Sequence, residues 1–152
     1  MSIESEDRSL KWIMIISFIG LIDAIYLSYL HHLVSAGEGC PTQDLPGLDC
    51  GVVLASDQAK LFGIPVAWLG VVGFLMLIAL SLDRYLNMDL ERTYYNKILL
   101  PITGIIGVVF GSYLTYAEAF IIHEWCPFCV VAFILTIAAT FFCITEYGHE
   151  IK

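Results

Sequence analysis

The sequence predicts an all-α integral membrane protein, a bundle of four transmembrane helices with both termini in the cytoplasm. Three observations predict this fold. Hydrophobic residues make up 59 % of the 152 residues, well above the roughly 45–50 % of an ordinary soluble domain, and the mean hydropathy is +0.80. Only 14 % of the residues are charged, and they gather between long apolar runs. Four of these runs are long enough to cross a hydrocarbon core about 30 Å thick.

The four apolar runs give the expected helices, at about 12–34, 63–82, 98–122 and 127–147. Each supplies about the 20 helical residues that a span needs. Backbone groups in lipid must be satisfied internally, so a helical bundle follows. The first run is longer than the apolar stretch of a signal peptide and is preceded by acidic residues, so we expect it to be retained. A chain of this length has room for one domain.

The basic residues predict which side each loop faces. With both termini inside, the outer loops contain a single basic residue, Lys60. This distribution is expected, because Lys and Arg are in excess in the cytoplasmic loops of membrane proteins. The outer side then carries a long first loop at about 35–62 and a short second one at 123–125. A net charge of −8 gives no basis for nucleic-acid binding. The cytoplasmic basic residues are Arg8, Lys11, Arg84, Arg92, Lys97 and Lys152.

Three groups of residues in or near the spans are expected to have structural roles, in helix packing or at the membrane interface. Gly104, Gly107 and Gly111 lie at close to helical spacing, which is typical of a close contact between membrane helices. Glu118 is expected to reach the membrane interface, and His31 lies near the outer boundary, where interfacial solvation is favoured over a role in proton transfer. His32 and His123 are interpreted in the same way as His31.

Four of the five cysteines fall on the predicted outer side. Cys40 and Cys50 belong to the first loop, and Cys126 and Cys129 form a Cys-Pro-Phe-Cys segment where the fourth helix begins. Disulfides persist in the oxidising compartments outside the cytoplasm. Cys143 is fourteen residues beyond Cys129, about 21 Å deeper at about 1.5 Å per residue. We interpret Cys143 as a buried, small apolar residue.

The position of the Cys-x-x-Cys pair favours redox chemistry. Cys126 lies at a helix N-terminus, where Pro127 suits the first helical position and unpaired N–H groups stabilise a thiolate. Thiolates are the reacting species in disulfide exchange, and a Gly- and Pro-rich loop can carry the other pair between two sites. Two static disulfides, chance occurrence and a four-cysteine zinc site remain alternatives. Zinc is the least favoured, because Cys40 and Cys50 are too far apart for a close zinc-binding pair.

Four segments together carry a more specific pattern: Tyr26-Leu27-Ser28, Cys50-x₅-Ser56, Phe62-Gly63-Ile64-Pro65 and Cys126-Pro127-Phe128-Cys129. In content and order they resemble the vitamin K epoxide reductase family, in its bacterial and archaeal branch. The loop pair precedes Cys-x-x-Cys, which is the reverse of the order in the DsbB family.

The resemblance implies a four-helix bundle around a quinone, with the first loop partly covering the site. It implies that a reduced thioredoxin-like partner gives electrons to a Cys40–Cys50 disulfide. Cys50 then attacks Cys126, and Cys129 passes the electrons to the quinone. Quinone-binding residues implied in this way are Ser56, whose hydroxyl would hydrogen-bond a quinone oxygen, together with Cys129 and Phe133.

The expected function is a membrane thiol–quinone oxidoreductase that reoxidises a DsbA-like partner and supports disulfide formation. Vertebrate members carry a tyrosine and an asparagine where this sequence has Phe133 and Ala59, so reduction of ubiquinone or menaquinone is favoured over epoxide reduction. The alternatives are a quinone or vitamin K epoxide reductase and a non-catalytic module with structural disulfides. Some members have a fused thioredoxin domain, and because this sequence ends at Lys152 we expect a separate partner. A catalytic monomer is the default expectation, and the four apolar spans predict a multi-pass location in the cell membrane.

Overall fold

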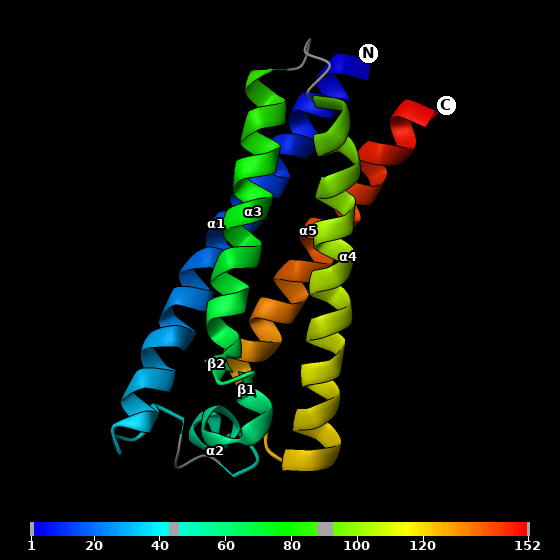
Figure 1. Ribbon diagram of the computed structural model, residues 1–152. Helices are drawn as coiled ribbons and strands as arrows, with labels where there is room; N and C mark the ends of the chain where they lie inside the picture. The colour runs from blue at the N-terminus through cyan, green and yellow to red at the C-terminus, as the bar shows by residue number, and fades with distance from the viewer. Residues whose placement is uncertain (1, 43–45, 88–92, 152) are drawn as a thin grey trace.

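The computed structural model describes residues 2–42, 46–87 and 93–151. Four long helices form the bundle in Figure 1: α1 (Ser2–Ser35), α3 (Val66–Leu86), α4 (Thr93–Ala117) and α5 (Pro127–Ile151). A π-helical turn, η2 (Glu118–Ile122), continues α4. Between α1 and α3 the chain forms α2 (Cys50–Ala55), the short 3₁₀ turn η1 (Asp57–Ala59) and a two-stranded antiparallel hairpin of β1 (Lys60–Leu61) and β2 (Ile64–Pro65).

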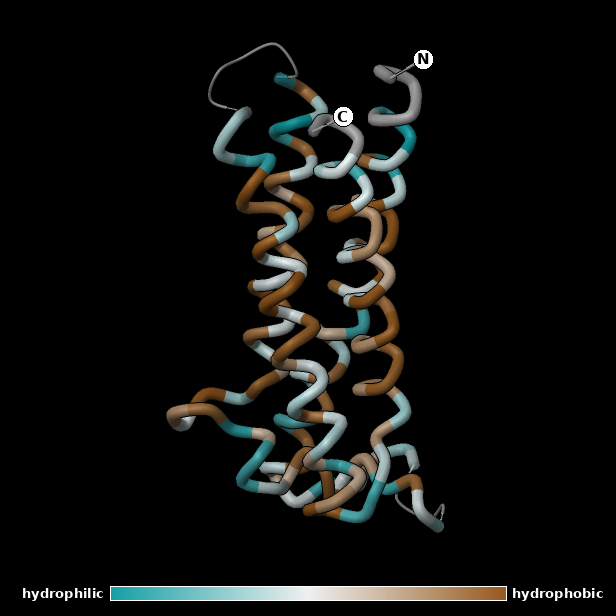
Figure 2. The backbone as a smooth tube through the Cα atoms, turned by 90° about the vertical axis from the view of Figure 1, so that its right-hand side faces the viewer, coloured by the Kyte–Doolittle hydropathy of each residue, from teal (hydrophilic) through white to brown (hydrophobic). Residues whose placement is uncertain are grey.

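Within the described residues, four helical segments are long and apolar enough to cross a membrane. Apolar residues occupy the central parts of the helices, and hydrophilic residues are concentrated near the helix ends (Figure 2). These four apolar helices indicate a multi-pass membrane protein, as the sequence predicted. The segments are Asp7–Ser35, Val66–Leu86, Tyr94–Ile122 and Pro127–Gly148.

The two ends of the bundle differ. Both termini lie at one end, which we call the terminal end, and α2 and the β1–β2 hairpin lie at the other, the loop end (Figure 1). Lys60, in β1, belongs to the loop end, whereas Arg8 and Lys11 lie in the first turns of α1 at the terminal end. Arg92 and Lys152, which entered the prediction of topology, lie outside the described residues.

Arg84 corrects the expected boundary of the second span. The expected second span ended at about residue 82 and left Arg84 outside it, but α3 continues to Leu86 and Arg84 is only 1 % exposed. Its Nη2 atom lies 3.4 Å from Oε1 of Glu146 in α5. Because a buried charge is tolerated only when it is paired and hydrogen-bonded, this ion pair explains how the last turn of α3 packs inside the bundle.

The glycines of α4 provide the close contact with α5. A Cβ atom at Gly104 would lie 2.7 Å from Oγ1 of Thr140, and one at Gly107 would lie 2.9 Å from Cγ2 of Thr136. A Cβ atom at Gly111 would overlap the ring of Phe133. The prediction that these glycines allow close helix packing is therefore confirmed.

A separate core lies at the loop end of the bundle. Its buried residues come from α1, the loop after α1, α2 and the position just before α5, and three of them are cysteines: Cys40, Cys50 and Cys126. Leu27, Leu30, Val53 and Leu54 are buried in the same cluster. The loop cysteines are therefore packed against the helices and not left on a free loop surface.

Candidate functional site: a row of four cysteines beside a cavity

Cys50 is fixed by the start of α2. Asp49 is the N-cap of this helix, and its Oδ1 accepts a hydrogen bond of 3.1 Å from the backbone N–H of Val52. The N–H of Cys50 donates to Oγ1 of Thr42 at 3.3 Å. Capping side chains of this kind satisfy N–H groups that have no partner within the helix. They hold the fully buried Cys50 sulfur at one position beside α5.

Cys126 directly precedes α5, as the Cys-Pro pattern predicted. Pro127 is the first residue of the helix, and the carbonyl of Cys126 accepts a hydrogen bond of 3.1 Å from the N–H of Val130. The chain reaches this point through the η2 turn and His123, whose φ of 60° is left-handed. The buried Cys126 sulfur therefore lies at the N-terminus of α5, where backbone N–H groups have no partner within the helix.

The four predicted cysteines form one row of sulfur atoms. Sγ of Cys50 lies 3.2 Å from Sγ of Cys126. Cys40 interacts with Cys50 at one end of the row, and Cys129 interacts with Cys126 at the other. All five cysteines carry free thiols, and Cys143 is buried separately in the core on the terminal side. The contact between Cys50 and Cys126 brings the loop pair and the Cys-x-x-Cys pair together. Two independent structural disulfides would not need this contact.

The electrostatics of the row distinguish its two central sulfurs. The hydrogen bond from the Cys129 side chain, followed by that from Cys50, lowers the pKa of Cys126 to about 4, although burial opposes this. The backbone N–H groups of Phe128 and Cys129 add to the effect. The pKa of Cys50 is raised, because its S–H donates to the Cys126 thiolate and because it is buried. Cys126 is therefore the thiolate and Cys50 the thiol when the row is reduced.

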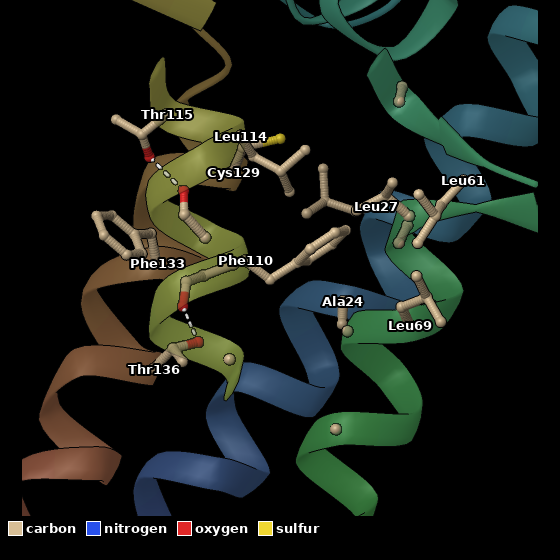
Figure 3. A pocket seen from close by; sticks show the side chains of 18 of the residues that line it. Ala24, Leu27, Leu61, Leu69, Phe110, Leu114, Thr115, Cys129, Phe133 and Thr136 are labelled. Carbon is tan, nitrogen blue, oxygen red and sulfur yellow. Dashed lines mark hydrogen bonds between the residues drawn. The ribbon is translucent and has the colours of Figure 1, made fainter. Parts of the chain in front are cut away.

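A cavity of about 490 Å³ lies next to Cys129, between the four long helices and beneath α2. Its walls are mainly apolar, and Figure 3 shows Leu27, Leu61 and Phe110 around it. This size and lining are typical of sites for small organic ligands. Among the described residues, no group of three or more His, Cys, Asp or Glu side chains is arranged to hold a metal ion.

The residues that the resemblance assigned to a quinone all line this cavity: Ser56, Cys129 and Phe133. The Ser56 hydroxyl donates a hydrogen bond of 2.6 Å to the carbonyl of Val53. Its hydrogen is therefore engaged, and its oxygen is left as an acceptor. Phe133 packs against Gly111 of α4 and contributes an apolar part of the lining.

The prediction that Glu118 reaches the membrane interface is wrong. Its side chain is 3 % exposed and lines the cavity. Oε2 of Glu118 accepts a hydrogen bond of 3.3 Å from the N–H of Cys126, and the Cys129 thiol interacts with the same carboxylate. A signal was present in the sequence, because Glu118 is seven residues after Gly111 and so lies on the helix face that packs against α5.

The prediction of interfacial solvation fails for one of the three histidines. His31 is 7 % exposed, lines the cavity and hydrogen-bonds the backbone of Leu54 in α2. His32 and His123 are exposed. The signal that distinguishes His31 is its position four residues after Leu27, on the face of α1 that forms the cavity wall.

These features define a class of protein: a four-helix membrane bundle in which two cysteine pairs meet at one end, beside an apolar cavity. The chain belongs to the Vitamin K epoxide reductase family, whose sequence model matches residues 11–144. It is also similar to the thiol-disulfide oxidoreductase LTO1 of Arabidopsis thaliana, with 26 % identity over 129 residues. That alignment covers 83 % of this chain and 33 % of the relative, so the chain spans a third of the relative's length. The family resemblance predicted from the four sequence segments is confirmed.

Proposed function

We propose that this protein is a membrane thiol–quinone oxidoreductase that reoxidises a separate thioredoxin-like, DsbA-type protein and thereby supports disulfide formation. The observation that carries this proposal is the distance of 3.2 Å between the sulfurs of Cys50 and Cys126, in a row that ends at Cys129 on the wall of the cavity. Family membership and the relative's thiol–disulfide chemistry support the same function.

The proposed orientation puts the loop end outside the cytoplasm and the termini inside, in the cell membrane. The basic residues support this orientation, because Arg8, Lys11 and Lys97 are in helical segments that begin at the terminal end. The row of cysteines then faces an oxidising compartment, where a thioredoxin-like partner is found. Cys40 is 7 % exposed, so attack by the partner on a Cys40–Cys50 disulfide requires local opening of the loop end.

The electron path follows the order of the row. After the partner has reduced the Cys40–Cys50 disulfide, the Cys50 thiolate attacks Cys126 in a Cys126–Cys129 disulfide, and Cys129 leaves as a thiolate. Cys40 then attacks Cys50 and expels Cys126. The low pKa of Cys126 favours this last step, because a thiol of lower pKa is the better leaving group. The loop disulfide is restored, and both electrons remain on Cys126 and Cys129.

The cavity fits a quinone of the ubiquinone or menaquinone type. Its apolar walls suit a ring and an isoprenoid chain, and Cys129 lies on its lining. Gln58 supplies N–H donors on the lining near α2, where a quinone oxygen would find a partner. A bound quinone supplies a two-electron acceptor that takes up two protons.

Two alternatives receive less support. Vertebrate members are thought to open the epoxide with a tyrosine and an asparagine, and the side chains at the corresponding positions on the cavity wall, Phe133 and Ala59, cannot donate a hydrogen bond. A module with two structural disulfides does not require the close approach of Cys50 and Cys126. Simple quinone reduction is therefore the function that the site supports best.

The test is quinone reduction by the purified protein, with a reduced thioredoxin-like protein as electron donor. We expect turnover in the intact protein and its loss in Cys50→Ser, Cys126→Ser and Cys129→Ser. Cys143→Ser is the matched control and retains turnover, because Cys143 lies in a different core. Unchanged turnover in Cys126→Ser, or the absence of turnover with every donor and quinone, would overturn the proposal.

A further inference from the structure

Glu118 is a buried carboxylate at the point where the row of sulfurs meets the cavity, and the electron path above does not use it. We propose that Glu118 is a catalytic base that takes the proton of the Cys129 thiol when this sulfur gives up its electrons. The inference rests on the proposed function, and it assigns the proton to a particular atom of the chain.

The local backbone directs this carboxylate to the sulfurs. Glu118 is the first residue of η2, where the chain changes from α-helix to π-helix, a feature that is frequent at functional sites. Its side chain is buried and accepts the hydrogen bond of 3.3 Å from the N–H of Cys126. This bond holds the carboxylate beside the first turn of α5, on which Cys129 lies.

The Cys129 thiol has two acceptors around it. One is the Cys126 thiolate, with which it shares a hydrogen bond, and the other is the Glu118 carboxylate. When the Cys126–Cys129 disulfide forms, the lone pair of Cys126 makes the new S–S bond and cannot hold the proton. Glu118 is the remaining acceptor of the two, and a carboxylate in contact with a thiol is placed to act as a general base.

The atoms and electrons of this step balance. The S–H bond of Cys129 breaks and an O–H bond forms on Glu118, while the bonding pair stays on sulfur. The Cys126 thiolate then bonds to Cys129, and two electrons pass to the quinone. Two protons follow them, one from the Glu118 carboxyl and one from water. Glu118 is a carboxylate again at the end of the cycle.

The matched variants separate this role from a structural one. Glu118→Gln keeps an oxygen for the N–H of Cys126 but cannot take a proton, and Glu118→Asp keeps the base on a shorter side chain. Glu124→Gln is the control, because Glu124 lies on the connection between η2 and α5 and its buried Oε2 has no hydrogen-bond partner among the described residues.

The first measurement is infrared spectroscopy of the fully reduced, quinone-free protein. The S–H stretching band of Cys129 is assigned by its loss in Cys129→Ala. We expect this band to shift in Glu118→Gln and to stay in place in Glu124→Gln. A band that is identical in the intact protein and in Glu118→Gln would show that the thiol does not contact the carboxylate, and the inference would be overturned.

The second measurement is single-turnover quinone reduction by the reduced protein. We expect Glu118→Gln to slow this step about 100-fold or more, the usual contribution of a general base, with a smaller loss in Glu118→Asp and none in Glu124→Gln. Quinone reduction at an unchanged rate in Glu118→Gln overturns the inference and leaves the proposed function standing. A shifted S–H band in a protein that never reduces quinone overturns the proposed function, and with it the catalytic role of Glu118, while the contact remains.

Discussion

The ionisation of Cys126 can be measured directly. Its pKa of about 4 corresponds to roughly a thousandfold excess of thiolate over thiol at pH 7. A cysteine with a pKa of 9.0, the ordinary value, would be roughly 1 % thiolate at the same pH. In the reduced protein, Cys126 should therefore be almost entirely in its thiolate form throughout the neutral pH range.

The largest cause of this low pKa is the hydrogen bond from the Cys129 side chain, which a substitution can remove or preserve. Alanine at position 129 removes the donor, so the pKa of Cys126 should rise. Serine keeps an O–H donor at the same place, so Cys129→Ser should retain most of the effect. The hydrogen bond from Cys50 and those from the backbone remain in both variants.

The assay is a pH titration of thiolate absorbance near 240 nm in reduced protein, with Cys126→Ser subtracted to isolate Cys126. We expect a transition near pH 4 in the intact protein, a clearly higher one in Cys129→Ala and an intermediate one in Cys129→Ser. A transition near pH 9 in the intact protein would refute the assignment of Cys126 as the thiolate. Equal values in Cys129→Ala and Cys129→Ser would refute the role given to the side-chain donor.

Three further changes should alter stability or local opening. Gly104→Ala should lower the free energy of unfolding by about 1–2 kcal/mol in thermal or denaturant unfolding, because the new methyl group crowds Thr140. Arg84→Leu should lower it by about 3–5 kcal/mol in the same assay, because the substitution removes one member of an ion pair that is buried inside the bundle. Asp49→Ala should weaken the start of α2 by about 1 kcal/mol and speed alkylation of the buried Cys50 several-fold.

Each of these changes has a control. Gly73→Ala should not destabilise α3, because nothing lies within 4 Å of a Cβ atom there. Arg84→Lys keeps a cation beside Glu146 and should cost less than Arg84→Leu. Asp49→Asn keeps an acceptor for the N–H of Val52 and should leave Cys50 protected. Loss of stability in Gly73→Ala equal to that in Gly104→Ala, or equal effects in the other two pairs, would contradict the reasoning.

Much of the fold could be predicted because the membrane imposes long apolar runs. The helix boundaries were harder to predict where polar residues are paired inside the bundle. The charge of Arg84 alone predicts a position outside the span. Its burial is explained only by its contact with Glu146, which is sixty-two residues away in the sequence. Long-range pairs of this kind leave no periodic signal in the sequence.

The cysteines of the site could be identified from the sequence, since the Pro after Cys126 marks a helix N-terminus and the family segments set their order. The polar residues of the cavity, Glu118 and His31, were not identified from the sequence. Glu118 and His31 lie near the ends of spans, where exposed and buried side chains have similar sequence contexts. Their spacing from Gly111 and Leu27 fits inward helix faces, but only the packing of α2 over the loop end shows what they contact.

The central claim is that Cys126 and Cys129 pass two electrons directly to a quinone. It is tested most directly by adding one equivalent of ubiquinone or menaquinone, without oxygen and without any partner protein, to fully reduced protein carrying Cys40→Ser and Cys50→Ser. We predict one quinol per protein, with a Cys126–Cys129 disulfide found by peptide mapping, and neither product when Cys129→Ser is added. Quinone that stays oxidised while both thiols remain free would contradict the account.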